Sequence, residues 1–299
     1  RSGVRPEVAT GLIAGSSVLG MLIPPSILMI VYGLLTDQPI GKLFIAGVVP
    51  GVLVVVAYSA YILIMGPRLY ERGRNGVSSP DSTVALERVS FGGVFGLVAT
   101  IVILLGGIYT GIFTVVEAAA IGAALAVASS VVSRRLDLIG IGSALASSVV
   151  TTASIGIIFL SANFYSKAIA LVGLPGSIQR LLSEADVSRE LVLLLVCLVI
   201  FALGFVLDTV STLTIVIPVA YPILTSFNVD LIWFGILAIL AAEMGLITPP
   251  VGLSVYALKA ALPEEADVPV EDIFKGSIPF LLLMILVFTL VFFFPGLLL

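Results

Sequence analysis

The chain has 299 residues, of which 60% are hydrophobic and 11% charged, with a mean hydropathy of +1.25 and a net charge of −4. Soluble domains are about 45–50% apolar and about 25% charged, so this composition predicts an integral membrane protein and excludes soluble enzymes and nucleic-acid-binding proteins. The chain has no histidine and a single cysteine, Cys197, which excludes disulfide bonds within the chain, histidine-based catalysis and His/Cys metal sites.

Long apolar runs predict that membrane-spanning helices fill most of the chain. A helix needs about 20 mostly apolar residues to cross about 30 Å of hydrocarbon. The runs lack the period-two alternation of transmembrane β-strands, so the expected fold class is an all-α polytopic membrane protein. In chain order, the candidate runs are Val8–Leu35, Phe44–Met65, Phe91–Ile112, Thr114–Ser133, Ser147–Val172, Leu191–Leu224, Leu231–Leu262 and Ile278–Leu298.

Two of these runs are interrupted by paired prolines, Pro24-Pro25 and Pro249-Pro250. Proline removes a backbone donor and clashes with the carbonyl four residues earlier, so two in a row should unwind the helix locally. Carbonyls freed inside a membrane must be buried in protein, line a cavity or bind a cation. Sodium, a hard cation, suits such carbonyls together with the Thr248 hydroxyl, and the half-helix that follows each break attracts anions at its N-terminus. Single prolines, Pro50 and Pro279, should only kink their helices.

The run Leu191–Leu224 is too long for one crossing and carries Asp208 near its middle. A re-entrant hairpin with a polar tip fits this pattern better than one tilted helix. With a hairpin, lysines and arginines fall ten to three on the two sides, against eight to five for a single crossing. The positive-inside rule therefore favours a hairpin that opens to the outside, with the C-terminus periplasmic. The ten cytoplasmic residues are Arg1, Arg5, Arg68, Arg72, Arg74, Arg88, Arg134, Arg135, Lys259 and Lys275, and the three outer ones are Lys42, Arg180 and Arg189.

The segments around the two proline pairs, Gly20–Ser26 and Gly245–Val251, resemble each other. In this topology the two copies cross the membrane in opposite directions, which predicts the inverted-topology repeat of many secondary transporters. The first copy has no counterpart of the hairpin, and the chain begins with Arg1 rather than methionine. We therefore expect further N-terminal sequence that contains another hairpin, opening to the cytoplasm.

The family resemblance given below implies a transport domain that is separate from scaffold helices. The segment Arg134–Ala146 has an apolar face and flanking arginines, which favours an interfacial helix that acts as a lateral arm. The first-repeat part of the transport domain and the helix that follows it take residues 1–65, and a cytoplasmic linker takes 66–90. Scaffold helices and the arm take 91–146, and a helix with an outer loop takes 147–190. The second-repeat part takes 191–262, with the hairpin at 191–224 and the broken helix at 231–262, and a cytoplasmic loop with the last scaffold helix takes 263–299.

Ionisable side chains inside the apolar runs are costly in lipid and are functional by default. Asp208 is expected to contact the substrate or an ion, or else to cap a helix of the hairpin. Glu117 is expected to have a structural or capping role, whereas Glu243 could either make a structural bond or join the site. Lys167 could snorkel outward or meet a substrate carboxylate.

Five motifs are distinctive: GMLIPPSI (20–27), TVVEAAAIG (114–122), LDTVSTLT (207–214), WFG (233–235) and GLITPPVG (245–252). Together they resemble the large membrane subunit of TRAP transporters, the tripartite ATP-independent periplasmic transporters of bacteria and archaea. The resemblance implies an inverted-repeat, elevator-type carrier for sodium-coupled uptake of organic acid anions such as C4-dicarboxylates, sialic or other sugar acids, or keto acids. It also implies a small four-helix membrane subunit and a periplasmic substrate-binding protein as partners, a location in the bacterial inner membrane, and Na⁺ as coupling ion with no other cofactor.

The resemblance further implies where ions and substrate bind. Val210 departs from the threonine that is frequent at this position, so any ligand there must be a carbonyl, and Val115-Val116 replaces the common Thr-Pro. The implied first sodium site uses Gly20, Ile23 and Pro25, and the second uses Leu207, Val210, Gly245, Thr248 and Val251. The implied substrate contacts are Asp208, Ser26, Thr209 and Ser211, with Lys167 in place of an arginine that binds carboxylates in some members.

Other classes of protein stay open at this point. An ion-coupled anion symporter that works without a binding protein would share the broken helices, although Leu207–Ser211 departs from the Ser-Asn-Thr tips of divalent-anion symporters. An intramembrane aspartyl protease would need a second buried aspartate facing Asp208. A purely structural subunit would leave the repeated helix breaks without a purpose.

Overall fold

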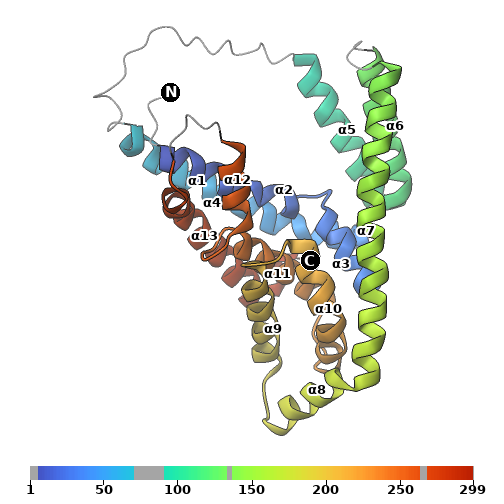
Figure 1. Ribbon diagram of the computed structural model, residues 1–299, viewed down its shortest axis with the longest axis vertical. Helices are drawn as coiled ribbons and strands as arrows, with labels where there is room; N and C mark the ends of the chain where they lie inside the picture. The colour runs from blue at the N-terminus through green and yellow to red at the C-terminus, as the bar shows by residue number, and fades with distance from the viewer. Residues whose placement is uncertain (1–5, 71–90, 133–136, 263–267, 299) are drawn as a thin grey trace. The chain divides into compact units, whose positions relative to one another are not determined.

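The structure, a computed structural model, describes residues 6–70, 91–132, 137–262 and 268–298 (Figure 1). Every regular element in these ranges is a helix. By length and composition, five of the described helices could cross a membrane, and a bent pair of helices could add a sixth crossing. The prediction of an all-α polytopic membrane protein is therefore confirmed.

The chain divides into two compact units, which are described separately: Arg1–Gly76 with Ser161–Leu299, and Val77–Leu160. The second unit holds α5 (Phe91–Tyr109) and α6 (Val115–Val132), which pack on each other, and most of α7 (Leu138–Val172). At the start of α6, Glu117 Oε2 accepts hydrogen bonds of 2.8 Å from the backbone N–H and the hydroxyl of Thr114. This arrangement is a capping box, and it confirms the structural role predicted for Glu117.

The first proline pair interrupts a helix, as predicted. Helices α1 (Pro6–Ser17) and α2 (Leu19–Leu22) lead to the break, and α3 (Ile27–Thr36) leaves it at an angle of 44°. Ser26 closes the break because its hydroxyl donates to the Met21 carbonyl and accepts from the Met29 N–H at 3.4 Å. Proline supplies no N–H here, so this serine side chain satisfies backbone groups that the lost helical turn leaves open.

The second proline pair separates α11 (Leu231–Leu246) from α12 (Leu253–Ala261). Gly252 precedes α12 with φ +52°, a left-handed conformation that favours glycine. Before the break, the Thr248 hydroxyl donates to the Met244 carbonyl at 2.6 Å, and the Thr248 N–H donates to the Gly245 carbonyl at 3.1 Å. Both breaks predicted from the sequence are therefore present, whereas the opposite membrane orientation of the two copies stays a prediction.

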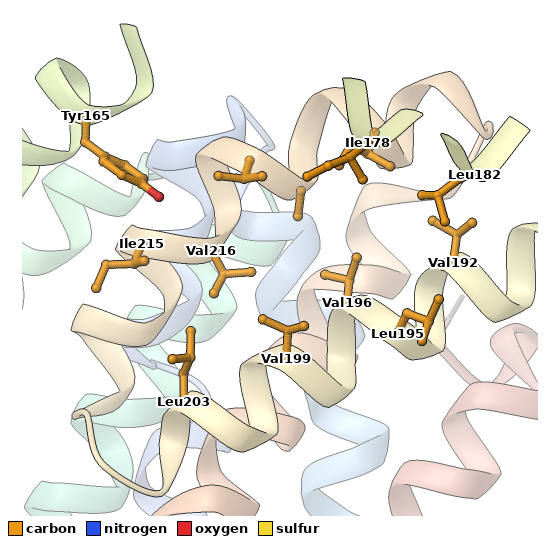
Figure 2. Close-up of a pocket in the computed structure, with 13 residues that line it drawn as sticks. Tyr165, Ile178, Leu182, Val192, Leu195, Val196, Val199, Leu203, Ile215 and Val216 are labelled. Carbon is orange, nitrogen blue, oxygen red and sulfur yellow. The ribbon is translucent and has the colours of Figure 1, made fainter. Parts of the chain in front are cut away.

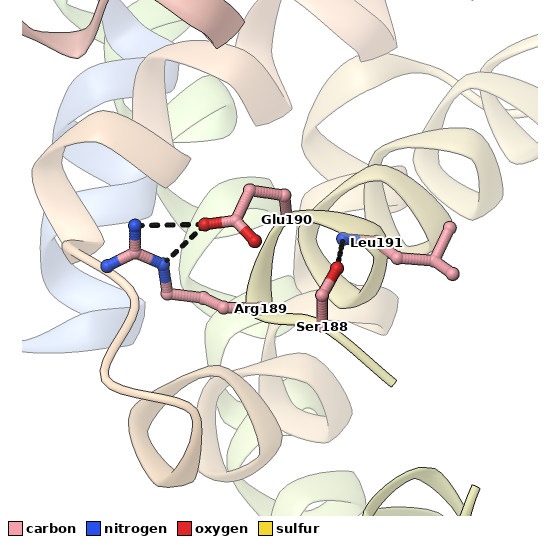
Figure 3. Close-up of polar contacts among 4 residues, drawn as sticks. All are labelled: Ser188, Arg189, Glu190 and Leu191. Atoms are coloured by element: carbon pink, nitrogen blue, oxygen red, sulfur yellow. Dashed lines mark hydrogen bonds and ion pairs between the residues drawn. The ribbon is translucent and has the colours of Figure 1, made fainter. Parts of the chain in front are cut away.

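The long apolar run folds as two helices joined by a short turn. Helix α9 (Arg189–Gly204) and helix α10 (Thr209–Ser226) pack against each other, as the hairpin prediction requires. At the exposed start of α9, Ser188 Oγ accepts from the Leu191 N–H at 3.3 Å, and Arg189 pairs with Glu190 at 3.0 Å (Figure 3). The ion pair is about half exposed, so it adds little to stability, and the cap is the main feature that begins the helix here.

Helix α11 forms the centre of the first unit, and its residues 233–245 are all buried. It packs on α9, α10, α3, α4 (Ile40–Tyr70) and α13 (Val270–Phe293). Asp230 caps it by accepting from the Trp233 N–H at 2.8 Å, and the Trp233 indole donates to the Val291 carbonyl at 2.9 Å. Helix α11 is apolar on every side and is enclosed by other helices, so it is the element on which the rest of this unit is built.

Some predicted boundaries were wrong. Helix α7 runs from Leu138 to Val172 without a break, so the predicted arm at Arg134–Ala146 is not a separate helix within the described residues. The predicted outer loop contains a further helix, α8 (Leu174–Glu184). Helix α13 begins at Val270, eight residues before the predicted start, and the short η2 (Pro295–Leu298) follows it. Pro50 and Pro279 lie inside continuous helices, as predicted.

Several sequence-based assignments cannot be placed. Residues 66–70 of the predicted linker belong to α4, and residues 71–90 lie outside the described part of the chain. The same is true of residues 1–5, 133–136 and 263–267, which carry several of the predicted cytoplasmic charges and much of the predicted cytoplasmic loop. The predicted division into transport and scaffold domains therefore stays a prediction.

Candidate ion and substrate site

The tip of the hairpin presents a carboxylate at the start of a helix. Asp208 is exposed, and it caps α10 by accepting from the Ser211 N–H at 3.1 Å and from the Ser211 hydroxyl. A carboxylate at a helix N-terminus is stabilised by the unpaired N–H groups and by the helix dipole. Capping, one of the two roles expected for Asp208, is thus present, and the exposed carboxylate remains accessible to a ligand.

The next residue, Thr209, faces the opposite way. Its side chain is only 5% exposed, and its hydroxyl donates to Oε1 of Glu243 on α11 at 3.0 Å. Glu243 is 1% exposed, so this hydrogen bond lies inside the protein. Of the two roles left open for Glu243, the structure shows a bond, and that bond reaches the hairpin tip rather than its own helix.

The backbones of the hairpin and the second break touch directly. A Cβ atom added to Gly245 would lie 2.7 Å from the Cα of Gly204 and 2.8 Å from the carbonyl oxygen of Phe201. Only glycine permits two helices to approach this closely, so both glycines are required for the contact. The structure therefore brings together the hairpin and the second break, the two segments in which the family resemblance implies one sodium site.

The polar backbone and side-chain groups of that predicted site differ in the hydrogen bonds that they already make within the protein. The Val210 carbonyl accepts from the Thr214 hydroxyl at 2.7 Å, and the Leu207 N–H donates to the Leu203 carbonyl at 2.9 Å. The Thr248 hydroxyl uses its hydrogen on Met244, so its oxygen lone pairs stay available to a cation. Gly245 is buried and Val251 half-buried beside these groups.

The first break presents a different surface. Gly20, Ile23 and Pro25 are exposed, whereas Ser26 is fully buried and its hydroxyl is occupied in capping α3. As the structure stands, Ser26 is a helix cap and does not face an open site. Lys167 is exposed on α7, and in the described part of the chain no hydrogen bond or ion pair connects it to the hairpin tip.

Backbone carbonyl and hydroxyl oxygens are the candidate cation ligands in this unit. The described residues contain no group of three or more His, Cys, Asp or Glu side chains that could hold a metal ion. Carbonyls and hydroxyls are the ligands that alkali and other hard cations accept, so the two breaks are the appropriate places for such an ion.

A separate cavity of about 350 Å³ lies between α8, α9 and α10 (Figure 2). Its walls are aliphatic apart from Tyr165, whose ring points into it. Such a cavity offers little to an anion, which needs polar partners in place of water. The lining residues are Tyr165, Ile178, Leu182, Val192, Leu195, Val196, Val199, Leu203, Ile215, Val216, Val219, Ala220 and Ile223.

Thr212 is a buried polar residue whose environment the sequence does not predict. This side chain is fully buried on α10, and its hydroxyl is the one buried side-chain oxygen or nitrogen of the described residues without a hydrogen-bond partner. A polar residue one turn after the hairpin tip was the available signal, but the sequence does not reveal that its hydroxyl is buried without a hydrogen-bond partner.

Replacing Thr212 with valine is expected to raise the free energy of unfolding by about 1 kcal/mol, because a buried hydroxyl without a partner costs about 1–3 kcal/mol. The melting temperature in detergent measures this change. Thr209→Val is the matched control: it removes a hydroxyl that has a partner, and should lower the melting temperature. A lower melting temperature for Thr212→Val would show that its hydroxyl is engaged by a group such as a bound ion.

Comparison with known proteins identifies the family. The family model described as the tripartite ATP-independent periplasmic transporter, DctM component, matches residues 1–297. The sialic acid TRAP transporter permease protein SiaT of Haemophilus influenzae is 28% identical over 98% of this chain, which spans 46% of that relative. The C4-dicarboxylate TRAP transporter large permease protein DctM of Pseudomonas aeruginosa is 31% identical, and the ectoine TRAP transporter large permease protein TeaC of Halomonas elongata is 30% identical. Each matches 99% of this chain, which spans 67% of each relative.

These comparisons decide between the classes left open by the sequence. The relatives are permeases and none is an enzyme, as predicted for this chain. The match extends over nearly the whole chain, including both helix breaks and the hairpin. The chain belongs to the DctM family, the large membrane component of tripartite ATP-independent periplasmic transporters.

Proposed function

We propose that this chain carries the ion- and substrate-binding part of a sodium-coupled carrier that takes up organic acid anions by an elevator motion. The observation that supports the proposal most is the direct contact between the hairpin tip and the second helix break, through Gly204 with Gly245 and Thr209 with Glu243. A site built from two discontinuous helical segments is typical of secondary transporters, where it holds ions on backbone oxygens and anions at helix N-termini.

Two sodium sites are proposed, one at each break. Thr248 is the best supported ligand, because its hydroxyl oxygen has free lone pairs next to the unwound segment. The Val210 carbonyl would have to share its oxygen between the ion and the Thr214 hydroxyl. The proposed ligands are Gly20, Ile23 and Pro25 at the first site, and Leu207, Val210, Gly245, Thr248 and Val251 at the second.

The proposed substrate is a small organic acid whose carboxylate binds close to the hairpin tip. Relatives of similar identity are named for sialic acid, C4-dicarboxylates and ectoine, compounds that all carry a carboxylate. Asp208 and Ser211 lie at this tip, where the Asp208 carboxylate would accept from donor groups of the substrate, and Lys167 is the cationic candidate for its carboxylate. The hydroxyls of Ser26, Thr209 and Ser211 each donate an internal hydrogen bond, so these residues would donate to substrate only after a rearrangement.

The proposed setting is the bacterial inner membrane, with the C-terminus in the periplasm. The proposed partners are a small four-helix membrane subunit, which would complete the scaffold, and a periplasmic binding protein, which would deliver the substrate. Family membership supports both partners. Co-purification with each candidate partner, and uptake that requires both, would test this assembly.

Sodium coupling predicts that Na⁺ raises the melting temperature of the full-length protein above its value in K⁺ at equal ionic strength. A ligand that binds only the folded state adds about 2.7 kcal/mol at a hundredfold excess over its Kd. Thr248→Val should remove most of this rise, because valine has nearly the same size as threonine but lacks the hydroxyl that would bind the ion. Ser188→Ala, which alters a cap far along α9 from the break, should leave the Na⁺-specific rise intact. Equal melting in both salts would contradict sodium coupling.

A further inference from the structure

Glu243 is the only fully buried acidic or basic side chain among the described residues. It lies in α11, two residues before Gly245, and is 1% exposed. Carboxyl groups inside membrane helices are costly and are usually found where the protein binds ligands or changes conformation. The ion and substrate contacts proposed above do not use this group, so its presence needs another explanation.

The contacts of Glu243 connect two parts of the proposed site. Its Oε1 accepts the Thr209 hydroxyl at 3.0 Å, and Thr209 is the first residue of α10. Asp208, the exposed tip acid, directly precedes Thr209 in the chain, and Gly245 and Thr248 at the second break lie two and five residues after Glu243. The hydrogen bond therefore runs between the substrate-facing tip and the ion-facing break.

The close packing between the ends of α9 and α11 would transmit a displacement of the hairpin tip to the second break. The Gly204 and Gly245 backbones are in contact, and a Cβ atom added to Gly204 would lie 2.9 Å from the Ala242 carbonyl oxygen. The end of α9 and the end of α11 therefore cannot slide towards each other. With the backbones in contact on one side and the Thr209–Glu243 bond on the other, a shift of the tip moves the break with it.

A gain in stability alone does not explain why the Thr209–Glu243 pair is buried here. A typical hydrogen bond within a protein contributes modestly to stability, and a buried polar pair can often be replaced by apolar groups at little cost. The pair supplies instead a directional link between two segments that are 34 residues apart in the chain. A link of this kind fixes one segment relative to the other, which apolar packing does less specifically.

We propose that the Thr209–Glu243 hydrogen bond couples the hairpin tip to the second helix break, so that a ligand bound at one fixes the geometry of the other. Glu243 is then a positioning residue rather than an ion ligand. The coupling is reciprocal, since an ion that orders the tip for substrate must bind more tightly when substrate is present. Its role in transport depends on the proposed function, but the link itself can be tested without transport.

Hydrogen–deuterium exchange of the full-length protein in lipid nanodiscs tests the link. The two segments to follow are 205–212 at the tip and 245–252 at the break. In K⁺, Thr209→Val should speed exchange about two- to tenfold in both segments, the range expected from the loss of one hydrogen bond. Thr209→Ser and Glu243→Gln, which keep a donor and an acceptor, should exchange like the unmodified protein.

Thr214→Val is the matched control. Thr214 lies on the same helix, is 7% exposed against 5% for Thr209, and its hydroxyl donates to Val210 of its own helix. This variant should leave exchange at 245–252 unchanged. If Thr209→Val affects only the tip, or if Thr214→Val affects the break equally, the link is overturned.

A second comparison separates this proposal from sodium coupling. In the unmodified protein, Na⁺ should slow exchange in both segments, because the proposed second site takes ligands from each. In Thr209→Val, the same slowing should require a higher Na⁺ concentration, because the tip and the break are no longer held together before the ion binds. If Na⁺ changes neither segment in the unmodified protein, sodium coupling at the second break fails, and the K⁺ comparison still decides whether Thr209 and Glu243 connect the two segments.

Discussion

Replacing Gly245 with alanine is expected to abolish uptake and to lower the free energy of unfolding by about 3 kcal/mol. The added Cβ would lie 2.7 Å from the Gly204 backbone and 2.8 Å from the Phe201 carbonyl oxygen. These obstructing atoms belong to the backbone, so no side chain can rotate away, and overpacking of this kind costs about 1–3 kcal/mol or more. The forced separation also opens the contact between hairpin and break, on which the proposed ion site depends.

The melting temperature and uptake into proteoliposomes measure the two effects. Gly176→Ala on α8 is the matched control, because a Cβ there has no atom within 4 Å. This change should be neutral or slightly stabilising, since alanine favours the helix by about 0.5–1 kcal/mol. Equal melting temperatures for the two variants would show that α9 and α11 do not meet at these glycines.

Proline pairs and polar residues within apolar runs were the most reliable signals in the sequence. Both proline pairs separate helices in the structure, because neither residue can donate a backbone hydrogen bond. Asp208 marks the turn of the hairpin for a local reason as well: its carboxylate caps the helix that begins at the next residue. These features depend on neighbouring residues, so the sequence alone predicts them.

Helix lengths were less predictable. The predicted arm ending at Ala146 continues into the next helix because the sequence after Leu138 offers no proline, and glycine or serine in a long membrane helix does not by itself end it. Helix α8 was missed because its polar residues, such as Gln179 and Arg180, resemble those of a loop. In the structure α8 packs on α10, a contact that no local pattern reveals.

The tertiary contacts at the site could not be predicted at all. Nothing in the sequence pairs Thr209 with Glu243, and Gly204 was not singled out although it is the partner of Gly245. The internal repeat even suggests that Gly20 should resemble Gly245, yet a Cβ on Gly20 has no described atom within 4 Å. The difference arises because α9 packs on the second break, whereas no described helix takes the equivalent place at the first. Sequence similarity between the breaks therefore predicts that both helices are interrupted, but not what surrounds each interruption.

Asp208→Asn and Asp208→Ala should separate the two roles of the hairpin-tip acid. Asparagine caps helices about as well as aspartate, so Asp208→Asn should leave the free energy of unfolding within about 0.5 kcal/mol of its value in the unmodified protein, whereas Asp208→Ala should lower it by about 1 kcal/mol. If the exposed charge binds a substrate donor or a coupling ion, both variants should reduce uptake at least tenfold, which corresponds to about 1.4 kcal/mol. Uptake and melting temperature measured on the same preparations distinguish the cases. Normal uptake by Asp208→Asn would show that the carboxylate serves only as a cap, and would move the proposed substrate contact to Ser211 and Lys167.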